Sequence, residues 1–340
     1  MDVDRARRAL VAAIVGGGVA GGSLSPVRWY LNRFAPFSGS AWRDATDRPD
    51  TRVESPYGEA ELRYDDYGVA HVEADGERSL YFAAGYAQAA DRLFQMDLQR
   101  RVMRGRLSAI VGERALESDE FYVRMDFAGG AAANLELLAG TPTGEAIEAF
   151  ADGVNAYREN EPLPLEFGLL EYEPAPWTPV DTMLMEQQIA WGLTGSFWTL
   201  RRELVAERLG ADAAEELYPF RMDHDAPVLR DRDGGASPER SVDPSGRFDD
   251  AELLDWLSAF EPPRGVGSNS WVVSGEYTDS GAPVVANDPH LEPMAPPVWY
   301  EMNLRTDEMS VRGWRSPASR SWSSARTARA RGGSPTPGPT

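Results

Sequence analysis

A polar stretch between residues 224 and 267 divides the sequence into two parts with different hydrophobic patterns. Before it, apolar residues recur near the 3.6-residue period of an amphipathic helix in residues 77–111, 144–157 and 180–209. After it, short runs rich in Val, Trp and Tyr alternate with Gly, Asp and Pro, which indicates strands. A chain with both patterns, segregated in this way, is predicted to have an α+β fold.

Three local patterns add detail to this division. Residues 59–72 alternate around turn residues, which predicts a β-hairpin. Asp181 stands where an N-cap is expected for the third helix. The dividing stretch has the composition of a linker or of an excised piece, and only residues 251–260 within it have a helical pattern. We therefore treat residues 55–223 as a helical region and residues 224–267 as a spacer.

The N-terminal residues 1–30 have the layout of a secretory signal. Arg5, Arg7 and Arg8 precede an uncharged, Gly-rich stretch that ends at Pro26, and a basic start followed by a short apolar middle is typical of such signals. We expect the protein to be exported or membrane-anchored on the extracellular face. The alternatives are a frayed N-terminal helix and a cytoplasmic protein.

Composition excludes several kinds of chemistry. The 340 residues contain no Cys and only three His, which excludes disulfides, thiolate catalysis and a His-rich metal centre. All 34 basic residues are Arg, so Schiff-base and Walker-type lysine chemistry is excluded too. The formal net charge of −20 would repel a polyanion, so no nucleic-acid partner is expected. Dense carboxylates without lysine fit a salt-adapted, halophilic protein.

The stretch GVGSNSWVVSG, which begins at Gly265, is followed by VVANDPHL. Four earlier segments stand out with it: DDYGVAHVEA, AAGYAQAADRLFQMDLQRRVMRGRLSAIVGE, FADGVNAY and LPLEFGLLEYEPAPWTPVD. Together, and in this order, they resemble the penicillin acylase family of N-terminal-nucleophile hydrolases over residues 59–313. The resemblance implies that family's αββα sandwich, here incomplete. Residues 55–223 would correspond to the α-chain, and residues 268–313 to the first strands of the β-chain.

The resemblance also implies a precursor that is cleaved between Gly267 and Ser268, so that Ser268 becomes the first residue of a new chain. Glycine before the serine permits the distorted backbone that attack on the preceding carbonyl requires. The new α-amine, with a pKa of about 7.7–8.0, could accept the hydroxyl proton through a water. An acyl-enzyme would form on the Ser268 Oγ, residues 224–267 would be removable, and the α- and β-chains of one precursor would be partners.

Supporting roles follow from the same resemblance. His290, 22 positions after Ser268, would contribute to the hydrogen-bond environment of the nucleophile; the alternative is a histidine that only caps a turn. Asn269 would serve local structure. The residues where relatives line the acyl pocket are Leu193, Phe197 and Trp198, for which core packing is the alternative.

No cofactor is implied for catalysis, and the resemblance allows a structural calcium ion. Glu203 resembles one of the family's calcium ligands, the alternative being an ordinary solvated helix glutamate. The resemblance also implies that the other ligands of that ion are absent from this chain.

The resemblance predicts a hydrolase for linear amides of acylated amines, and therefore a small-molecule partner. Its substrate would be a β-lactam side-chain amide, an N-acyl homoserine lactone or a similar amide. Two alternatives stay open. One is a non-catalytic binding protein that retains the helical half, and the other is a conventional serine hydrolase that is active without backbone cleavage.

Residues 314–340 differ from everything before them, with five Arg, no acid and no Val, Ile, Leu, Met, Phe or Tyr. Codons can be chosen so that a frame beginning at the third base of the Gly313 codon reads VAFPGVPVVVVGQNGARAWGFTNTGAD, which is similar to the family's continuation. We predict that one G was lost near Gly313, a hypothesis that the nucleotide sequence tests; the alternative is a disordered basic tail. Oxyanion donors, worth about 2.7–4 kcal/mol each, would lie in the displaced frame. We therefore expect the 340-residue chain to fold poorly, not to cleave itself and to have little activity.

Overall fold

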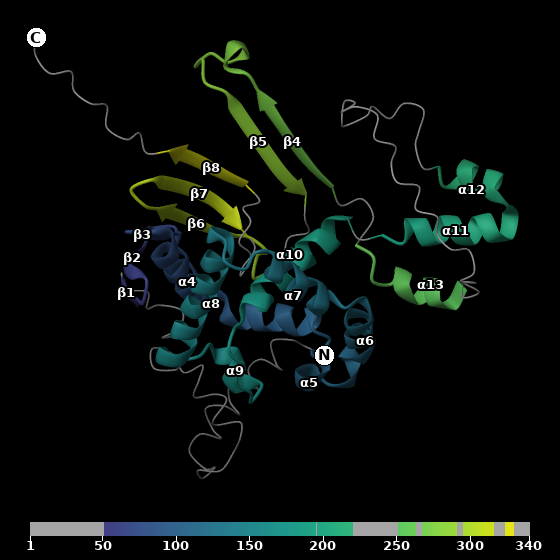
Figure 1. Cartoon of the computed structure of the whole chain (residues 1–340), viewed down its shortest axis with the longest axis horizontal. Coiled ribbons are helices and arrows are strands. Elements are labelled where there is room, and N and C mark those ends of the chain that lie inside the picture. Colours follow the sequence, from purple (N-terminus) through teal and green to yellow (C-terminus); the bar gives the residue numbers. More distant parts are fainter. Residues whose placement is uncertain are drawn as a thin grey trace, which may run out of the picture.

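The computed structural model describes residues 51–194, 196–219, 251–262, 267–290, 295–315 and 324–329. These residues form helices and strands in largely separate parts of the chain, which confirms the α+β class (Figure 1). The predicted leader and most of the predicted spacer lie outside the described residues. Within the described ranges, no helix is long and apolar enough to cross a bilayer.

The main sheet has six strands in the order β1-β2-β3-β6-β7-β8. Neighbouring strands are antiparallel, except that β3 and β6 run parallel. Because β3 precedes the predicted spacer and β6 follows it, this pair joins the two parts of the sequence in one sheet. The strands are β1 (Thr51–Ser55), β2 (Gly58–Tyr64), β3 (Ala70–Ala74), β6 (Tyr300–Arg305), β7 (Met309–Arg315) and β8 (Ser324–Arg329).

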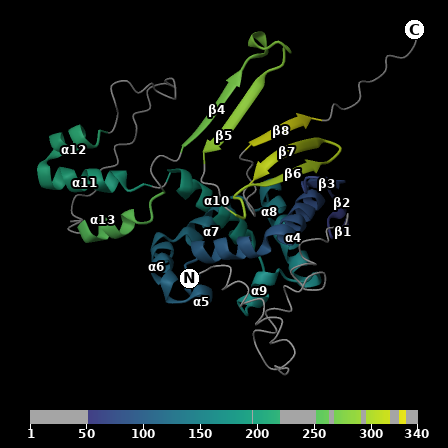
Figure 2. The same cartoon turned by 180° about the vertical axis from the view of Figure 1, so that it is seen from behind.

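A second, two-stranded sheet projects from the body of the molecule (Figures 1 and 2). It is an antiparallel hairpin of β4 (Gly267–Val273) and β5 (Val284–His290). The short 3₁₀ helix η2 (Gly275–Tyr277) lies in the connection between the strands. The nucleophile predicted from the sequence is therefore located on this hairpin and not on the six-stranded sheet.

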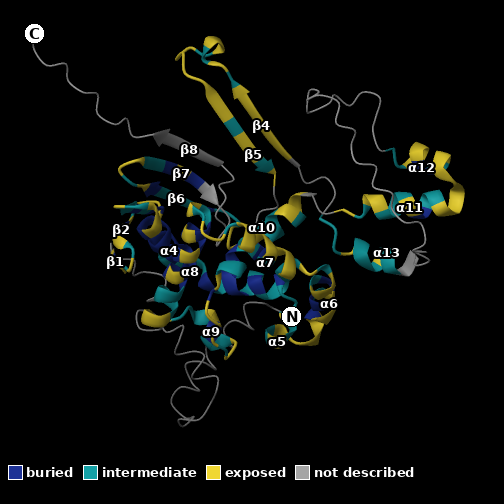
Figure 3. Ribbon diagram, in the orientation of Figure 1, coloured by how far each residue is buried: buried dark blue, intermediate teal, exposed yellow. Residues whose placement is uncertain are grey.

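Helices cover one face of the main sheet, where alternate strand residues such as Leu62, Val72 and Met302 are buried (Figure 3). Successive strand side chains point to opposite faces, so the residues between these, including Glu61 and Glu73, lie on the other face. Helix α4 (Glu77–Met103) packs directly against β1, β2, β3 and β6. The helices that follow it before β4 are α5 (Ser108–Val111), η1 (Glu113–Ala115), α6 (Leu116–Met125), α7 (Phe127–Leu137), α8 (Pro142–Asn160), α9 (Leu165–Leu169), α10 (Pro179–Thr194), α11 (Trp198–Leu209), α12 (Ala211–Leu217) and α13 (Ala251–Ser258).

Two glycines allow α4 and α8 to cross closely beneath the sheet. A Cβ atom on Gly85 of α4 would lie 2.2 Å from the carbonyl oxygen of Phe150, and one on Gly153 of α8 would lie 1.9 Å from that of Phe82. Contacts this short are sterically forbidden, so the two helix backbones can approach only where no side chain intervenes.

The helix boundaries differ in two places from the sequence-based prediction. The helix predicted over 77–111 ends at Met103, because Gly105 adopts a positive φ of +60° and Asp119 accepts hydrogen bonds from the backbone N–H groups of residues 107 and 108. The helix predicted over 180–209 is divided into α10 and α11, which end and begin at Thr194 and Trp198. The predicted hairpin at 59–72 and the helix in 251–260 are confirmed as β2–β3 and α13.

Asp181 does not have the N-cap role predicted for it. Its Oδ2 accepts hydrogen bonds from the backbone N–H and the hydroxyl of Thr178, while the Thr178 Oγ1 accepts from the Asp181 N–H. This reciprocal pattern is a capping box in which Thr178 is the N-cap and Asp181 the third helical residue. The sequence signal was assigned three positions too late.

The Asp181 carboxylate also belongs to a buried ion-pair network. Arg100 of α4 bonds to Asp97 at 2.6 Å and to Asp181 at 3.4 Å, and Arg104 bonds to Asp181 at 2.8 Å. Arg100 further donates to the carbonyl oxygens of residues 175 and 176. The network fixes the loop before α10 against α4, so Arg100 has a structural role.

The backbone of residues 324–329 pairs antiparallel with β7. The division of the chain near Gly313 stays a prediction, as do the other domain boundaries.

Candidate functional site

The β4–β5 register places the predicted site residues at one end of the hairpin. Gly267 lies opposite His290, Ser268 opposite Pro289 and Asn269 opposite Asp288. This end is remote from the turn of the hairpin, where η2 lies (Figure 1). The sequence separation of 22 residues between Ser268 and His290 is thus closed by strand pairing.

The pairing does not bring the Ser268 and His290 side chains onto the same face. Paired residues share a face of an antiparallel ladder and faces alternate along each strand, so His290 lies on the face of Asn269 and Asp288. Its Nε2 is 2.8 Å from the Asp288 Oδ2, whereas Ser268 lies on the face of Pro289. In this arrangement His290 can act on Ser268 only through the backbone, and its proposed role stays a prediction.

The hairpin residues are open to solvent in the described part of the chain. Ser268, Asn269 and His290 are exposed, and so are the large apolar side chains of Trp271 and Val285, at 53% and 70%. A hydroxyl at an exposed strand end is accessible to a substrate, but no described side chain within the hairpin encloses it.

The three predicted pocket residues lie at the junction of α10 and α11, and they have different surroundings. Leu193 is 62% exposed, and the ring of Trp198 packs edge-on against Tyr218 at 4.8 Å between centroids. Phe197 is half-buried and lies 5.7 Å from the Trp191 ring. Only Phe197 therefore takes part in a larger aromatic assembly.

That assembly, here called the aromatic cluster, was not predicted from the sequence. At its centre is the fully buried ring of Phe121, which stacks on Phe260 at 4.2 Å with an interplanar angle of 11°. The cluster combines residues from α6, α7, α10, α13 and the segments that follow α10 and α13. Its members are Phe121, Tyr122, Phe127, Trp191, Phe197, Trp256 and Phe260. Trp256 and Phe260 were the sequence features that could have indicated this packing. The prediction placed them in a spacer and therefore expected no contacts for them.

Next to the aromatic cluster, Arg201 of α11 and Glu261 form a two-pronged ion pair. The Nη1–Oε1 and Nη2–Oε2 distances are 2.7 and 2.6 Å. Glu261 Oε1 also accepts a hydrogen bond from the backbone N–H of Phe197. The hydrogen bonds with Glu261 raise the pKa of the Arg201 guanidinium above its ordinary value. We call this arrangement the Arg201–Glu261 clamp.

Glu203 is exposed on α11. Among the residues that the structure describes, no three His, Asp or Glu side chains gather in a metal-binding group. Calcium takes six to eight oxygen ligands, so the single Glu203 carboxylate does not make a calcium site within these residues. The assignment of Glu203 as a ligand stays a prediction.

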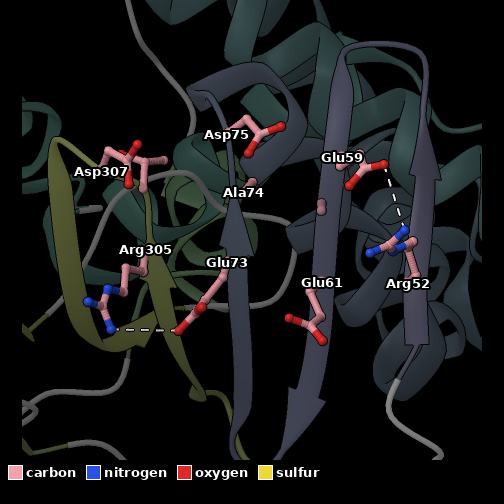
Figure 4. Close-up of a pocket in the computed structure, with 10 residues that line it drawn as sticks. Arg52, Glu59, Glu61, Glu73, Ala74, Asp75, Arg305 and Asp307 are labelled. Carbon is pink, nitrogen blue, oxygen red and sulfur yellow. Dashed lines mark ion pairs between the residues drawn. The ribbon is translucent and has the colours of Figure 1, made fainter.

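A separate groove lies across the solvent-facing side of β1, β2, β3 and β6, next to the β6–β7 turn (Figure 4). It is lined by acidic residues, which are partly neutralised by Arg305 paired with Glu73 and by Arg52 paired with Glu59, each at 3.7 Å. None of the predicted site residues lines it. Exposed ion pairs of this kind are typical of a solvated surface.

With this geometry described, the chain can be compared with known proteins. Residues 59–328 match the penicillin amidase family, a range that includes both the helical region and the hairpin that carries Ser268. The chain belongs to the penicillin amidase family. The resemblance inferred from its motifs is therefore confirmed.

Individual members of the penicillin amidase family are similar over the same part of the chain. The chain is 33% identical over 260 residues to "Penicillin acylase 2 proenzyme" of Pseudomonas sp. (strain SE83), covering 74% of this chain and 33% of that protein. It is 28% identical over 273 residues to "Acyl-homoserine lactone acylase QuiP" of Pseudomonas aeruginosa, covering 74% of this chain and 30% of that protein. The chain thus spans about a third of the length of these curated relatives.

A solved structure, the thermostable penicillin G acylase from Alcaligenes faecalis, is similar at 25% identity with a TM-score of 0.41. The similarity covers 54% of this chain and 99% of the solved chain.

Proposed function

We propose that this chain carries the nucleophile of a self-processing amide hydrolase. The substrate class is a linear amide of an acylated amine, and the attacking group is the hydroxyl of Ser268 at a newly formed chain start. The observation that carries the proposal is the family match through the motif GVGSNSWVVSG, whose residues from Gly267 to Val273 form β4 with Ser268 exposed near its beginning.

Self-processing would start with attack of the Ser268 Oγ on the carbonyl carbon of Gly267. The Oγ–C bond forms, the C–N bond breaks, and the hydroxyl proton moves to the nitrogen, which becomes the α-amine of Ser268. Water then hydrolyses the ester and leaves a Gly267 carboxylate and a free hydroxyl on Ser268. The relative from Pseudomonas sp. (strain SE83) supports a precursor, because its name describes a proenzyme.

Amide hydrolysis would repeat the same steps on a substrate. The α-amine accepts the Oγ proton through a water, the Oγ bonds to the substrate carbonyl carbon, and the proton is delivered to the leaving amine. Water releases the acid from the acyl-enzyme. The names of the two relatives, one a penicillin acylase and one an acyl-homoserine lactone acylase, support acylated amines as the substrate class.

Three further assignments belong to this proposal. We infer that His290 supports the site, that Glu203 is one ligand of a structural calcium ion whose other ligands lie downstream of the frame change predicted near Gly313, and that the N-terminal residues direct export or anchoring. The proximity of Gly267 and His290 in the ladder supports the first of these.

The test measures chain masses and amidase activity together. The 340-residue chain and a form continued in the alternative frame after Gly313 are purified, each as wild type, Ser268→Ala and Ser270→Ala. Ser270 is the matched control, because it lies two positions along the same exposed strand face. We expect fragments that end at Gly267 and begin at Ser268 in the continued form and in its Ser270→Ala variant, with no cleavage and no turnover after Ser268→Ala.

Amide turnover by an unbroken chain would disprove the proposed mechanism in favour of a conventional serine hydrolase. Turnover that survives Ser268→Ala would remove Ser268 from the reaction altogether. Folded protein of the continued form without cleavage or turnover would favour the non-catalytic binding protein.

A further inference from the structure

The last part of the predicted spacer is packed into the helical region. In α13 and the residues that follow it, Trp256 and Phe260 both contact the buried ring of Phe121, with centroid distances of 6.0 and 4.2 Å. The Arg124 guanidinium lies over the Trp256 ring at 5.3 Å. Aromatic contacts of this kind contribute about 0.5–1.5 kcal/mol each beyond their burial. Residues 256–260 therefore have specific stabilising contacts with the helical region, which a flexible linker lacks.

Polar contacts fix the same piece in one position. The indole Nε1 of Trp191 donates to the carbonyl oxygen of Phe260 at 3.2 Å, and Arg201 donates to the Ser258 hydroxyl at 2.7 Å. The Arg201–Glu261 clamp completes the set. Its two side chains are only 16% and 14% exposed, so the ion pair is shielded from much of the solvent screening that weakens surface pairs.

None of these contacts depends on the peptide bond between Gly267 and Ser268. Glu261 lies six residues before that bond. Every partner of residues 256–261 named above belongs to α6, α10 or α11, or is Phe197, the residue before α11. Cutting the chain after residue 267 therefore removes no contact from the piece.

We propose that residues 251–261 remain bound to the aromatic cluster as a retained plug after the chain is cut at Gly267–Ser268, with Phe260 and Glu261 as its anchors. The partner of this surface is thus a segment of the same chain, one that combines an aromatic ring with an adjacent carboxylate. The cut at Gly267–Ser268 is taken from the proposed function, and the proposal rests on it to that extent. The contacts that bind residues 251–261 do not depend on that function.

The plug has a consequence for the residue predicted to line the acyl pocket. The Glu261 carboxylate accepts the hydrogen bond from the backbone N–H of Phe197. The Phe197 ring contacts Trp191, which in turn donates a hydrogen bond to the carbonyl oxygen of Phe260. While the plug is bound, an acyl group cannot take the position of the Phe260 ring. Removal of the plug, by a second cut in residues 224–250 or by displacement, would then be a separate step from the cut at Ser268.

The experiment separates retention from self-cleavage by making both cuts with an added protease. Recognition sites for one site-specific protease are inserted between residues 235 and 236 and between residues 264 and 265 of the full chain. After digestion under native conditions, size-exclusion chromatography and mass spectrometry show whether the fragment 236–264 elutes with the rest of the protein or alone. We expect it to elute with the rest, and a fragment that elutes alone would overturn the proposal.

Variants identify the anchors. We expect Glu261→Ala and Phe260→Ala each to speed dissociation of the fragment at least about tenfold, because each removes a half-buried side chain that contacts the helical region. Asp255→Ala is the matched control, since Asp255 is exposed on α13 within the same piece, and should leave the rate unchanged. Equal dissociation rates for Glu261→Ala and Asp255→Ala would show that the clamp is not an anchor. Absence of self-cleavage in the form continued after Gly313 would contradict the proposed function and leave this result intact.

Discussion

His290 lies directly across from Gly267 in the ladder of β4 and β5. The residue before the predicted cleavage point is therefore held by strand pairing, and the side chain of the residue after it, Ser268, lies on the face opposite to His290. The prediction from the sequence placed the His290 side chain beside the Ser268 nucleophile, whereas the ladder places the two side chains on opposite faces of the hairpin.

We predict that His290→Ala slows cleavage at Gly267–Ser268 in the frame-continued chain by less than about 100-fold, the lower limit of general acid–base contributions. The reason is that His290 bonds to Asp288 on the far face and reaches Ser268 only through the backbone. Cleavage rates from the masses of samples taken over time measure the effect, with Asp288→Ala as the companion variant. A complete loss of cleavage, as expected for Ser268→Ala, would show that the ring acts on the nucleophile directly.

Gly153→Ala should lower the free energy of unfolding by about 1–3 kcal/mol, the usual cost of overpacking a tight contact. A Cβ at this position would lie 1.9 Å from the carbonyl oxygen of Phe82, so α8 must move away from α4. Urea titration followed by circular dichroism gives the change. The control is Gly192→Ala in α10, where a Cβ meets nothing within 4 Å and helix propensity predicts a gain of up to about 1 kcal/mol. Equal effects at both glycines would contradict the close crossing.

Arg100→Met should cost about 3–5 kcal/mol of stability, as expected when one partner of a buried ion pair is removed. The Arg100 side chain is 7% exposed and faces both Asp97 and Asp181, which would lose a cation without gaining water. Arg52→Met is the control, because Arg52 pairs with Glu59 at 73% exposure, and such pairs contribute about 0–1 kcal/mol. Denaturant midpoints measure both, and a loss at Arg100 no larger than at Arg52 would contradict the structural role of the network.

Asp65 should contribute to acid sensitivity. The backbone N–H of Val69, and after it the His71 ring, lower the pKa of the Asp65 carboxyl below its ordinary value. A group whose folded-state pKa is lowered stabilises the fold above its unfolded pKa, and this contribution is lost as the pH falls through the folded value. Stability should therefore decline less steeply below about pH 4 in Asp65→Asn than in wild type. Thermal midpoints between pH 6 and pH 2 check this, with Asp66→Asn as the neighbouring control. Parallel curves for all three proteins would be the contrary result.

Much of the fold could be predicted because its causes are local. The 3.6-residue period around Leu80, Leu93 and Met96 specifies the buried side of α4 whatever it packs against, and alternation around the turn at Asp65 specifies the β2–β3 hairpin. The end of α4 was missed because it depends on Asp119, a residue distant in sequence that accepts hydrogen bonds from the chain after Gly105. Local patterns contain no signal for such a partner.

The sequence by itself determined the family, the α+β class and the candidate nucleophile, because motif order and hydrophobic period are properties of neighbouring residues. Only the tertiary structure decided that residues 251–261 pack as part of the helical region and that His290 and Ser268 lie on opposite faces of a hairpin. The physical reason is the same in both cases. The Phe121–Phe260 stacking, the Arg201–Glu261 pair and the β4–β5 register join residues that are far apart in sequence, and their energies exist only once the chain has folded.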